Sequence, residues 1–237
     1  MPDSHPVRAV LFDLDGTLLD TAPDISRALN ALRREQALSP LPDAQVRPCV
    51  SHGATAVVKL GFPDVTPEVF ESLRERLLIL YSQALAVATR PFAGMPEVLA
   101  SLEQQGIAWG VVTNKAAWLA EPLLQELQLY ERAAVIVSGD TTPQRKPHPE
   151  PLLHAARHIG VAPAHCVYVG DAERDALAAR AAGMRMLVAL FGYLASTDRP
   201  HDWPAAGCID TPLDILAWLR RATVAQAEAA AAAADGR

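Results

Sequence analysis

The feature that most constrains this chain is a short apolar run that ends in two carboxylates. Residues 9–12 are apolar, and the residues that follow them in the sequence include Asp13, Asp15, Gly16 and Thr17. A short apolar run bounded by turn residues is typical of a buried strand in a parallel sheet. In open parallel sheets, ligands bind beyond the carboxyl ends of the strands. The sequence therefore predicts that both acids lie at a binding site.

The spacing of the two acids points to a particular chemistry. Residues two apart on an extended chain point the same way. Two like charges held close together are costly unless a cation or a shared proton relieves them. The pair Asp13 and Asp15 therefore indicates a metal ion, a nucleophile and a proton donor in one loop.

Further apolar runs alternate with helical patterns along the chain. Strands are predicted at residues 9–12, 108–112, 134–137, 166–169 and 186–190. Helices are predicted at residues 95–105, 117–128, 150–159 and 176–182, and the third of them begins after Pro149 and ends at Gly160. Strands that alternate with helices predict an α/β fold, a doubly wound parallel sheet with helices on both faces.

The segment from residue 21 to residue 90 breaks this alternation. It contains no convincing strand, and helical patterns cover residues 25–36, 54–60 and 68–85 with Pro and Gly between them. This pattern predicts an inserted α-helical cap at residues 21–90 over an α/β core of residues 1–20 and 91–222. Such a lid excludes water and selects the substrate. The alanine-rich residues 223–237 are expected to form a flexible tail or a frayed helix extension.

Composition narrows the class of protein further. The 237 residues are 50% apolar, and 21 Lys and Arg against 27 Asp and Glu give a net charge of -6. This balance argues against binding to nucleic acid or to a membrane surface. There is no long apolar run, no signal-peptide layout at the N-terminus, and no metal-ligand spacing among the three cysteines. We therefore expect a cytoplasmic monomer or homodimer with reduced cysteines.

Polar residues also follow other predicted strands. Thr113 and Asn114 follow the strand at 108–112, and Asp171 follows the strand at 166–169 with Asp175 four residues on. Lys146, one of three lysines, lies in a loop before a predicted helix. Each residue alone has an ordinary explanation as a capping, loop or surface residue. Those explanations do not account for the whole set.

Together these motifs resemble those of the haloacid dehalogenase superfamily, whose members are mostly magnesium-dependent phosphatases. The four motifs are Asp-x-Asp-x-Thr, a Ser or Thr at a strand end, a Lys, and a late acidic pair, and all occur here in order. They span residues 13–175, and the strand pattern extends the resemblance to about residue 219. The resemblance implies a Rossmann-like core, a helical cap, and hydrolysis of a small phosphorylated metabolite.

The resemblance also implies a role for each motif. Asp13 would be the nucleophile that forms an aspartyl-phosphate, and Asp15 would be the general acid and base. Thr113 would donate a hydrogen bond to a phosphoryl oxygen, and Asn114 would add a donor. Lys146 would neutralise the nucleophile and the phosphoryl group.

A magnesium site would use acids from the same loops. The Asp13 carboxylate, the Asp15 carbonyl and Asp171 would bind Mg²⁺, which prefers hard oxygen ligands and keeps part of its water shell. Asp175 would bind through water or act only as an acid at a helix N-terminus.

The cap segment at residues 47–54 holds the candidate substrate contacts. Arg47 is expected to bind a carboxylate, Ser51 and His52 to form hydrogen bonds, and Gly53 to allow close approach. A helix start capped by Ser51 explains the same residues equally well.

Two groups of phosphatases share local sequence with the chain. The start of the chain and the helical lid resemble phosphoglycolate phosphatases. Residues 51–54, 109–115 and 191–193 resemble bacterial N-acetylmuramic acid 6-phosphate phosphatases of peptidoglycan recycling. Both substrates carry a carboxylate, so Arg47 does not separate them, whereas the lactyl sugar needs the roomier pocket.

Other readings of the motifs remain open. A sugar-phosphate mutase of the β-phosphoglucomutase type would need a lid that retains and reorients a bisphosphate. A phosphonate hydrolase would need a Schiff-base lysine in the lid, where Lys59 is the one lysine and lies in a predicted helix. Asp15 argues against a dehalogenase, because superfamily dehalogenases lack this second acid. The complete motif set disfavours a non-catalytic regulatory module.

Overall fold

A computed structural model describes residues 5–235 of the chain, with side chains to residue 224. Its centre is a six-stranded sheet in the order β5-β4-β1-β6-β7-β8, and every neighbouring pair is parallel. The strands are β1 (Ala9–Phe12), β4 (Ala108–Val112), β5 (Val135–Val137), β6 (Cys166–Gly170), β7 (Arg185–Ala189) and β8 (Gly207–Ile209). The predicted α/β fold is confirmed.

Strand β1 lies near the middle of the sheet, which explains its uninterrupted apolar sequence. Ala9 pairs with Ala108 on one side and with Cys166 on the other, and all of β1 is buried. Val10 and Phe12 pack into one hydrophobic cluster, whereas Ala9 and Leu11 pack into another. Since alternate residues of a strand face opposite sides, the sheet has a core on each face.

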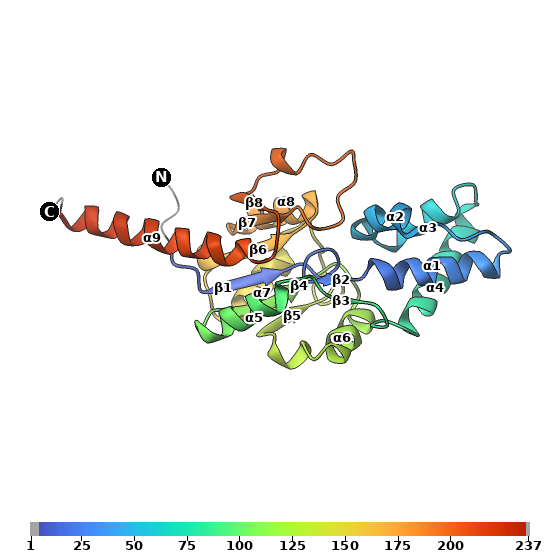
Figure 1. The fold of residues 1–237 in the computed structure, drawn as a ribbon, viewed down its shortest axis with the longest axis horizontal. Coiled ribbons are helices and arrows are strands. Elements are labelled where there is room, and N and C mark those ends of the chain that lie inside the picture. Colours follow the sequence, from blue (N-terminus) through green and yellow to red (C-terminus); the bar gives the residue numbers. More distant parts are fainter. Residues whose placement is uncertain (1–4, 236–237) are drawn as a thin grey trace.

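Helices cover both faces of the sheet (Figure 1). Helices α5 (Met95–Gln104) and α9 (Asp214–Asp235) pack together over one face, while α7 (Glu150–Ile159) and α8 (Glu173–Ala182) pack together over the other. Helix α6 (Ala117–Glu126) follows β4. The prediction for α7 is confirmed at both ends, and Gly160 after it adopts a φ of 74°. Helix α8 begins three residues earlier than predicted, so Asp175 lies in its first turn.

A helical block separates β1 from the rest of the sheet. It contains α1 (Ala22–Glu35), α2 (Asp43–Val46), the 3₁₀ turn η1 (Arg47–His52), α3 (Gly53–Gly61) and α4 (Pro67–Ser82). Figure 1 shows these helices grouped at the end of the molecule opposite the two termini. The chain enters the block through β2 (Leu19–Asp20) and returns through β3 (Arg90–Pro91), and these two strands pair antiparallel.

Not every feature followed from sequence. Strands β2, β3 and β8 were not predicted, because two or three residues are too few to show alternation. The two predicted borders of the cap, after residue 20 and after residue 90, lie at β2 and β3. The division into a core and a cap domain stays a prediction. Helix α9 continues to Asp235, so the predicted tail border at residue 223 falls inside it, and residues 236–237 lie outside the described part. Within the described residues, no helix is long and apolar enough to cross a membrane.

A buried carboxylate holds the returning end of the helical block. Asp24 in α1 accepts hydrogen bonds from the backbone nitrogens of Ala88 at 3.0 Å and Thr89 at 2.9 Å, and from the Thr89 hydroxyl at 2.8 Å. Arg27 lies 3.1 Å from the same carboxylate. Asp24 thus satisfies polar backbone groups that would otherwise be buried without partners.

We expect Asp24→Ala to lower the free energy of unfolding by about 2–4 kcal/mol, because the donors of Ala88 and Thr89 lose their acceptor. Urea denaturation followed by circular dichroism measures the change. Glu75→Ala, at an exposed position of α4, is the control and should change stability by less than about 0.5 kcal/mol. Equal stability of the two variants would contradict this role of Asp24.

Candidate active site

The candidate site lies at the carboxyl ends of the central strands. Asp13 follows β1, and its backbone nitrogen donates to the Val169 carbonyl of β6 at 2.8 Å. Thr113 follows β4, and its nitrogen donates to the Val137 carbonyl of β5 at 2.9 Å. Asp171 follows β6 directly. The sheet thus brings together residues that are far apart in sequence.

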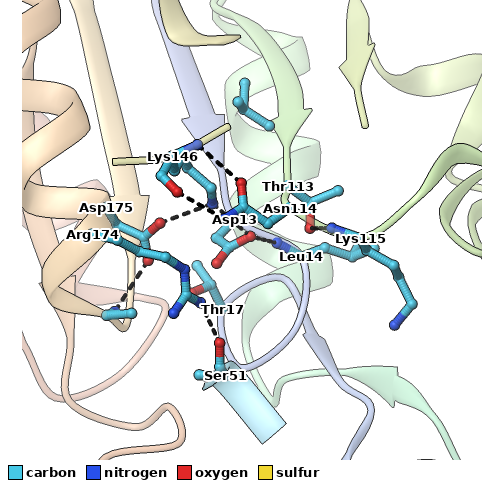
Figure 2. A network of polar contacts seen from close by, with 12 residues as sticks. Asp13, Leu14, Thr17, Ser51, Thr113, Asn114, Lys115, Lys146, Arg174 and Asp175 are labelled. Carbon is cyan, nitrogen blue, oxygen red and sulfur yellow. Dashed lines mark hydrogen bonds and ion pairs between the residues drawn. The ribbon is translucent and has the colours of Figure 1, made fainter. Parts of the chain in front are cut away.

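Lys146 connects the two buried acids on either side of it. Its Nζ lies 2.9 Å from Asp13 Oδ1, 2.8 Å from Asp175 Oδ1 and 2.7 Å from the Tyr168 hydroxyl. Burial acts to raise the pKa of Asp13, but the positive charges of Lys146 and Arg174 outweigh it, so this pKa lies below its ordinary value. Asp13 is therefore held as a carboxylate. Figure 2 shows Asp13, Lys146, Asp175 and Arg174 converging.

Asn114 contacts the loop that carries Lys146. Its side-chain amide donates to the Lys146 carbonyl at 2.9 Å, and its Oδ1 accepts from the Lys146 backbone nitrogen at 3.1 Å. The two bonds hold the loop that carries Lys146. Asn114 borders the cavity, but its amide is engaged with the protein backbone.

Asp171 is buried beneath the helical block. Its Oδ2 accepts from the Ser51 hydroxyl at 2.6 Å and from the Tyr193 backbone nitrogen at 2.8 Å, and its Oδ1 lies 3.4 Å from the Thr17 hydroxyl. Burial raises the pKa of Asp171 to about 7, and the negative charges of Asp13 and Asp175 act in the same direction.

Asp13, Asp171 and Asp175 form a group that can hold a metal ion. One oxygen of each acid lies within 4.8 Å of the others, and all three residues are buried. Burial and the charge of Asp13 raise the pKa of Asp175 even though Lys146 opposes them. Buried acids this close repel one another and call for a cation among them. The Asp15 side chain is not part of this group, and the use of its backbone carbonyl as a ligand stays a prediction.

Close packing around Asp171 explains two glycines. Gly16 has a φ of 82°, and a Cβ there would lie 2.2 Å from Asp171 Oδ2. A Cβ on Gly192 would lie 2.3 Å from the Asp171 Cβ. Because no larger residue fits at either position, both loops can close on the carboxylate.

A separate group fixes Asp15. Lys115 Nζ lies 2.7 Å from Asp15 Oδ1 and 3.1 Å from the Tyr81 hydroxyl of α4, and the Thr21 hydroxyl donates to Asp15 at 2.6 Å. Burial acts to lower the pKa of Lys115, but the charge of Asp15 outweighs it and raises this pKa. In Figure 2 the Lys115 side chain points away from Asp13. Sequence reasoning missed Lys115, although it follows the Thr113-Asn114 motif.

Arg174 was also missed by sequence reasoning. Its guanidinium donates to the Ser51 carbonyl. Burial acts to lower the pKa of Arg174, but the charges of Asp175, Asp13 and Asp171 raise it. Its position in the sequence, between Asp171 and Asp175, was a signal that could have identified it as a site residue.

A cavity of about 430 Å³ lies between the sheet end and the helical block. Asp13, Asp15 and Thr113 line it from the core. The cap residues Ser51, His52 and Gly53 also line it, so the structure places these predicted residues together; their roles stay predictions.

Arg47 lies elsewhere. Its Nη1 donates to both oxygens of the Asp20 carboxylate, at 2.9 and 3.0 Å, and its guanidinium lies over the Tyr193 ring, 4.7 Å from the ring centre. It is not among the residues that line the cavity. Arg47 does bind a carboxylate, but that carboxylate is the side chain of Asp20. Arg47 therefore has no part in the proposed substrate site.

The family model for haloacid dehalogenase-like hydrolases matches residues 10–189. The chain belongs to this family. The matched range includes the acids of the metal group, Thr113 and Lys146, and the resemblance deduced from the motifs is confirmed.

Among this hydrolase's relatives, a phosphoglycolate phosphatase from Xanthomonas campestris pv. campestris (strain 8004) is 47% identical over 205 residues, 86% of this chain and 93% of the relative. An N-acetylmuramic acid 6-phosphate phosphatase from Pseudomonas aeruginosa is 42% identical over 218 residues, 91% and 96% of the two chains. These full-length relatives are phosphatases, and the hydrolase is a phosphoric monoester hydrolase.

Solved structures agree with the fold. A crystal structure described as a predicted phosphoglycolate phosphatase from Haemophilus somnus has a TM-score of 0.78 at 25% identity and covers 89% of this chain and 96% of its own. A phosphatase structure from Clostridium difficile has a TM-score of 0.79 at 18% identity, which supports the fold alone.

The raised pKa of Asp171 predicts how metal-free protein responds to pH. An acid whose pKa is higher when folded destabilises the fold while it is charged, so the cost is full above about pH 7 and fades as the pH falls toward 4. In EDTA at pH 8, Asp171→Asn should be more stable than wild type by about 2–4 kcal/mol. This difference should shrink toward pH 5.

Chemical denaturation across this pH range tests the expectation. Asp64→Asn, at an exposed position, is the matched control and should follow wild type at every pH. A wild type at least as stable as Asp171→Asn at pH 8 would refute the claim that Asp171 is a strained buried charge.

Proposed function

We propose that this protein is a Mg²⁺-dependent phosphomonoesterase that acts through an aspartyl-phosphate on Asp13. The observation that carries the proposal is the position of Asp13: its carboxylate opens onto the cavity, lies 2.9 Å from a buried Lys146, and shares a metal-sized group with two other acids. An anionic nucleophile can attack a phosphoryl group only where such positive charge offsets the repulsion.

The first step transfers the phosphoryl group. A carboxylate oxygen of Asp13 forms a bond to phosphorus while the bond from phosphorus to the ester oxygen breaks. Asp15 gives its proton to the leaving oxygen. The Thr113 hydroxyl accepts from the Lys115 backbone nitrogen at 3.1 Å, which leaves its own hydrogen free to donate to a phosphoryl oxygen.

The second step regenerates the nucleophile. Asp15, now a carboxylate, takes a proton from a water molecule, and that water forms the new bond to phosphorus. The bond from Asp13 to phosphorus breaks, and inorganic phosphate leaves. Lys115 and Thr21 orient Asp15 in both steps through their contacts with its carboxylate.

The residues that would hold the metal fit a hard divalent cation. Asp13, Asp171 and the Asp15 carbonyl supply oxygen ligands, and Asp175 supports them while bound to Lys146. When bound, Mg²⁺ neutralises the acids and stabilises the negative charge on the transferring group. The raised pKa values of Asp171 and Asp175 support this assignment.

The helical block would close the site from above. Ser51 binds Asp171 through its hydroxyl and Arg174 through its carbonyl, so the cap joins the core at the metal ligands themselves. Closure at this point removes water from the reacting groups. Oligomeric state and cellular location stay as predicted from the sequence.

The relatives supply two candidate substrates, N-acetylmuramic acid 6-phosphate and 2-phosphoglycolate. Both are phosphate monoesters that carry a carboxylate. Phosphate release from the two compounds, measured side by side with Mg²⁺ and with EDTA, tests the proposed function and ranks the substrates. Metal-independent hydrolysis would count against the proposed mechanism.

Asp13→Asn should lower kcat at least about 1,000-fold on every phosphate ester, because the amide is a poor nucleophile. The substitution keeps the shape of the side chain, and circular dichroism checks the fold. Brief reaction of wild type followed by denaturation should leave hydroxylamine-sensitive phosphate on the chain, and Asp13→Asn should leave none. Turnover by a folded Asp13→Asn would overturn the mechanism.

Asp15→Asn should show the leaving-group dependence of a lost general acid. For p-nitrophenyl phosphate, whose phenolate leaves without a proton, kcat/KM should fall at least about tenfold less than for a sugar phosphate. The ratio kcat/KM is the right measure because it reports the steps through phosphoryl transfer. Equal losses on the two substrates would assign Asp15 to another role.

A further inference from the structure

The cavity contains more positive charge than a phosphoryl group alone requires. Arg74, Lys115, Arg145 and Arg174 all line it. Lys115 pairs with buried Asp15, Arg145 donates to a core carbonyl at Gly139, and Arg174 binds Ser51 beside the acid group. These three belong to the reacting end of the cavity, because their partners do. Arg74 comes from the cap and contacts none of them.

Arg74 is only weakly engaged within the protein. Its partner is Glu71, one turn earlier in α4, at 2.8 Å. The side chains of Arg74 and Glu71 are 35% and 57% exposed. Exposed ion pairs of this kind contribute little to stability. A substrate anion in the cavity can therefore replace Glu71 at little cost.

The helix sets how far Arg74 lies from the reacting groups. Arg74, Leu77, Leu78 and Tyr81 all line the cavity, at the spacing of one helix face. Lys115 donates a hydrogen bond to the Tyr81 hydroxyl and forms an ion pair with Asp15. The Tyr81 end of this helix face therefore lies nearest the reacting groups. Seven residues of helix place Arg74 about 10 Å further along the cavity.

Leu77 and Leu78 lie between these two positions on α4, and the apolar side chains of Ile25 and Trp118 also line the cavity. Trp118 is 49% exposed, so part of its ring is available to a ligand in the cavity. A flat body with apolar faces, such as a sugar ring, fits between the charged ends.

We propose that Arg74 binds the carboxylate of the substrate, and that the substrate is the phosphate monoester of an acidic sugar, with the two anionic groups at opposite ends of the cavity. The inference rests on the proposed phosphomonoesterase function and adds the substrate class. A two-carbon acid phosphate holds its carboxylate about 4 Å from phosphorus, too short to reach Arg74. A sugar that carries its phosphate and an ether-linked lactyl group on opposite sides of the ring spans about twice that distance.

Calorimetry on the Asp13→Asn background, with Mg²⁺ present, tests this without turnover. The ligands are N-acetylmuramic acid 6-phosphate, N-acetylglucosamine 6-phosphate, which lacks the lactyl carboxylate, and 2-phosphoglycolate. Adding Arg74→Gln should weaken binding of the acidic sugar about 10- to 100-fold and leave the other two ligands unchanged. The matched control is Arg76→Gln, on the same helix, whose partner is Glu35 outside the cavity; it should change nothing.

The outcomes separate the inference from the function. Equal weakening of both sugars by Arg74→Gln, or tighter binding of 2-phosphoglycolate than of the acidic sugar, would overturn the inference. Hydrolysis of p-nitrophenyl phosphate by wild type, lost in Asp13→Asn, would leave the proposed function standing in that case. Absence of any phosphatase activity would remove the function, while the binding contrast would still decide the role of Arg74.

Discussion

The contact between Lys146 and two buried acids is the interaction on which the site depends. Three carboxylates within 4.8 Å of one another cannot be buried without positive charge, and Lys146 supplies it at 2.9 Å from Asp13 and 2.8 Å from Asp175. Asp13 follows β1, Asp171 follows β6, Asp175 lies in the first turn of α8, and Lys146 comes from the loop before α7. Because β1 pairs parallel with β6, the strand ends that carry Asp13 and Asp171 lie side by side at one edge of the sheet.

The helical block takes part in this charge balance and is more than a cover. Ser51 bonds Asp171 directly, and Tyr81 bonds the lysine that holds Asp15. Both contacts bridge cap and core, so any movement of the cap changes the surroundings of an acid in the proposed mechanism. In the proposed function, these hydrogen bonds link the position of the cap to the acids of the core.

How much was predictable follows from how local each signal is. Asp13 and Asp15 were found because an apolar strand leads straight into them, and the fold followed from the alternation of strands and helices. Lys115 was missed because its role depends on Tyr81, 34 residues away, and on Asp15, 100 residues away. Arg47 was placed in the substrate site for its chemistry, whereas Asp20, close in space but 27 residues away in sequence, already binds it. A sequence shows which residues are charged, but it does not show which residue each charge pairs with in the folded protein.

This difference also explains why overall similarity does not choose the substrate. The two relatives with different substrates in their names are 47% and 42% identical to this chain over nearly the same share of it. The phosphoryl end of the cavity is built by the core and serves either substrate, since both present the same group to Asp13. The two candidate substrates differ in how far the carboxylate lies from phosphorus, and in the proposed binding mode Arg74, on the cap helix α4, reads that difference. Specificity in this arrangement therefore depends on a few positions on one face of a cap helix, which contribute little to a comparison of whole chains.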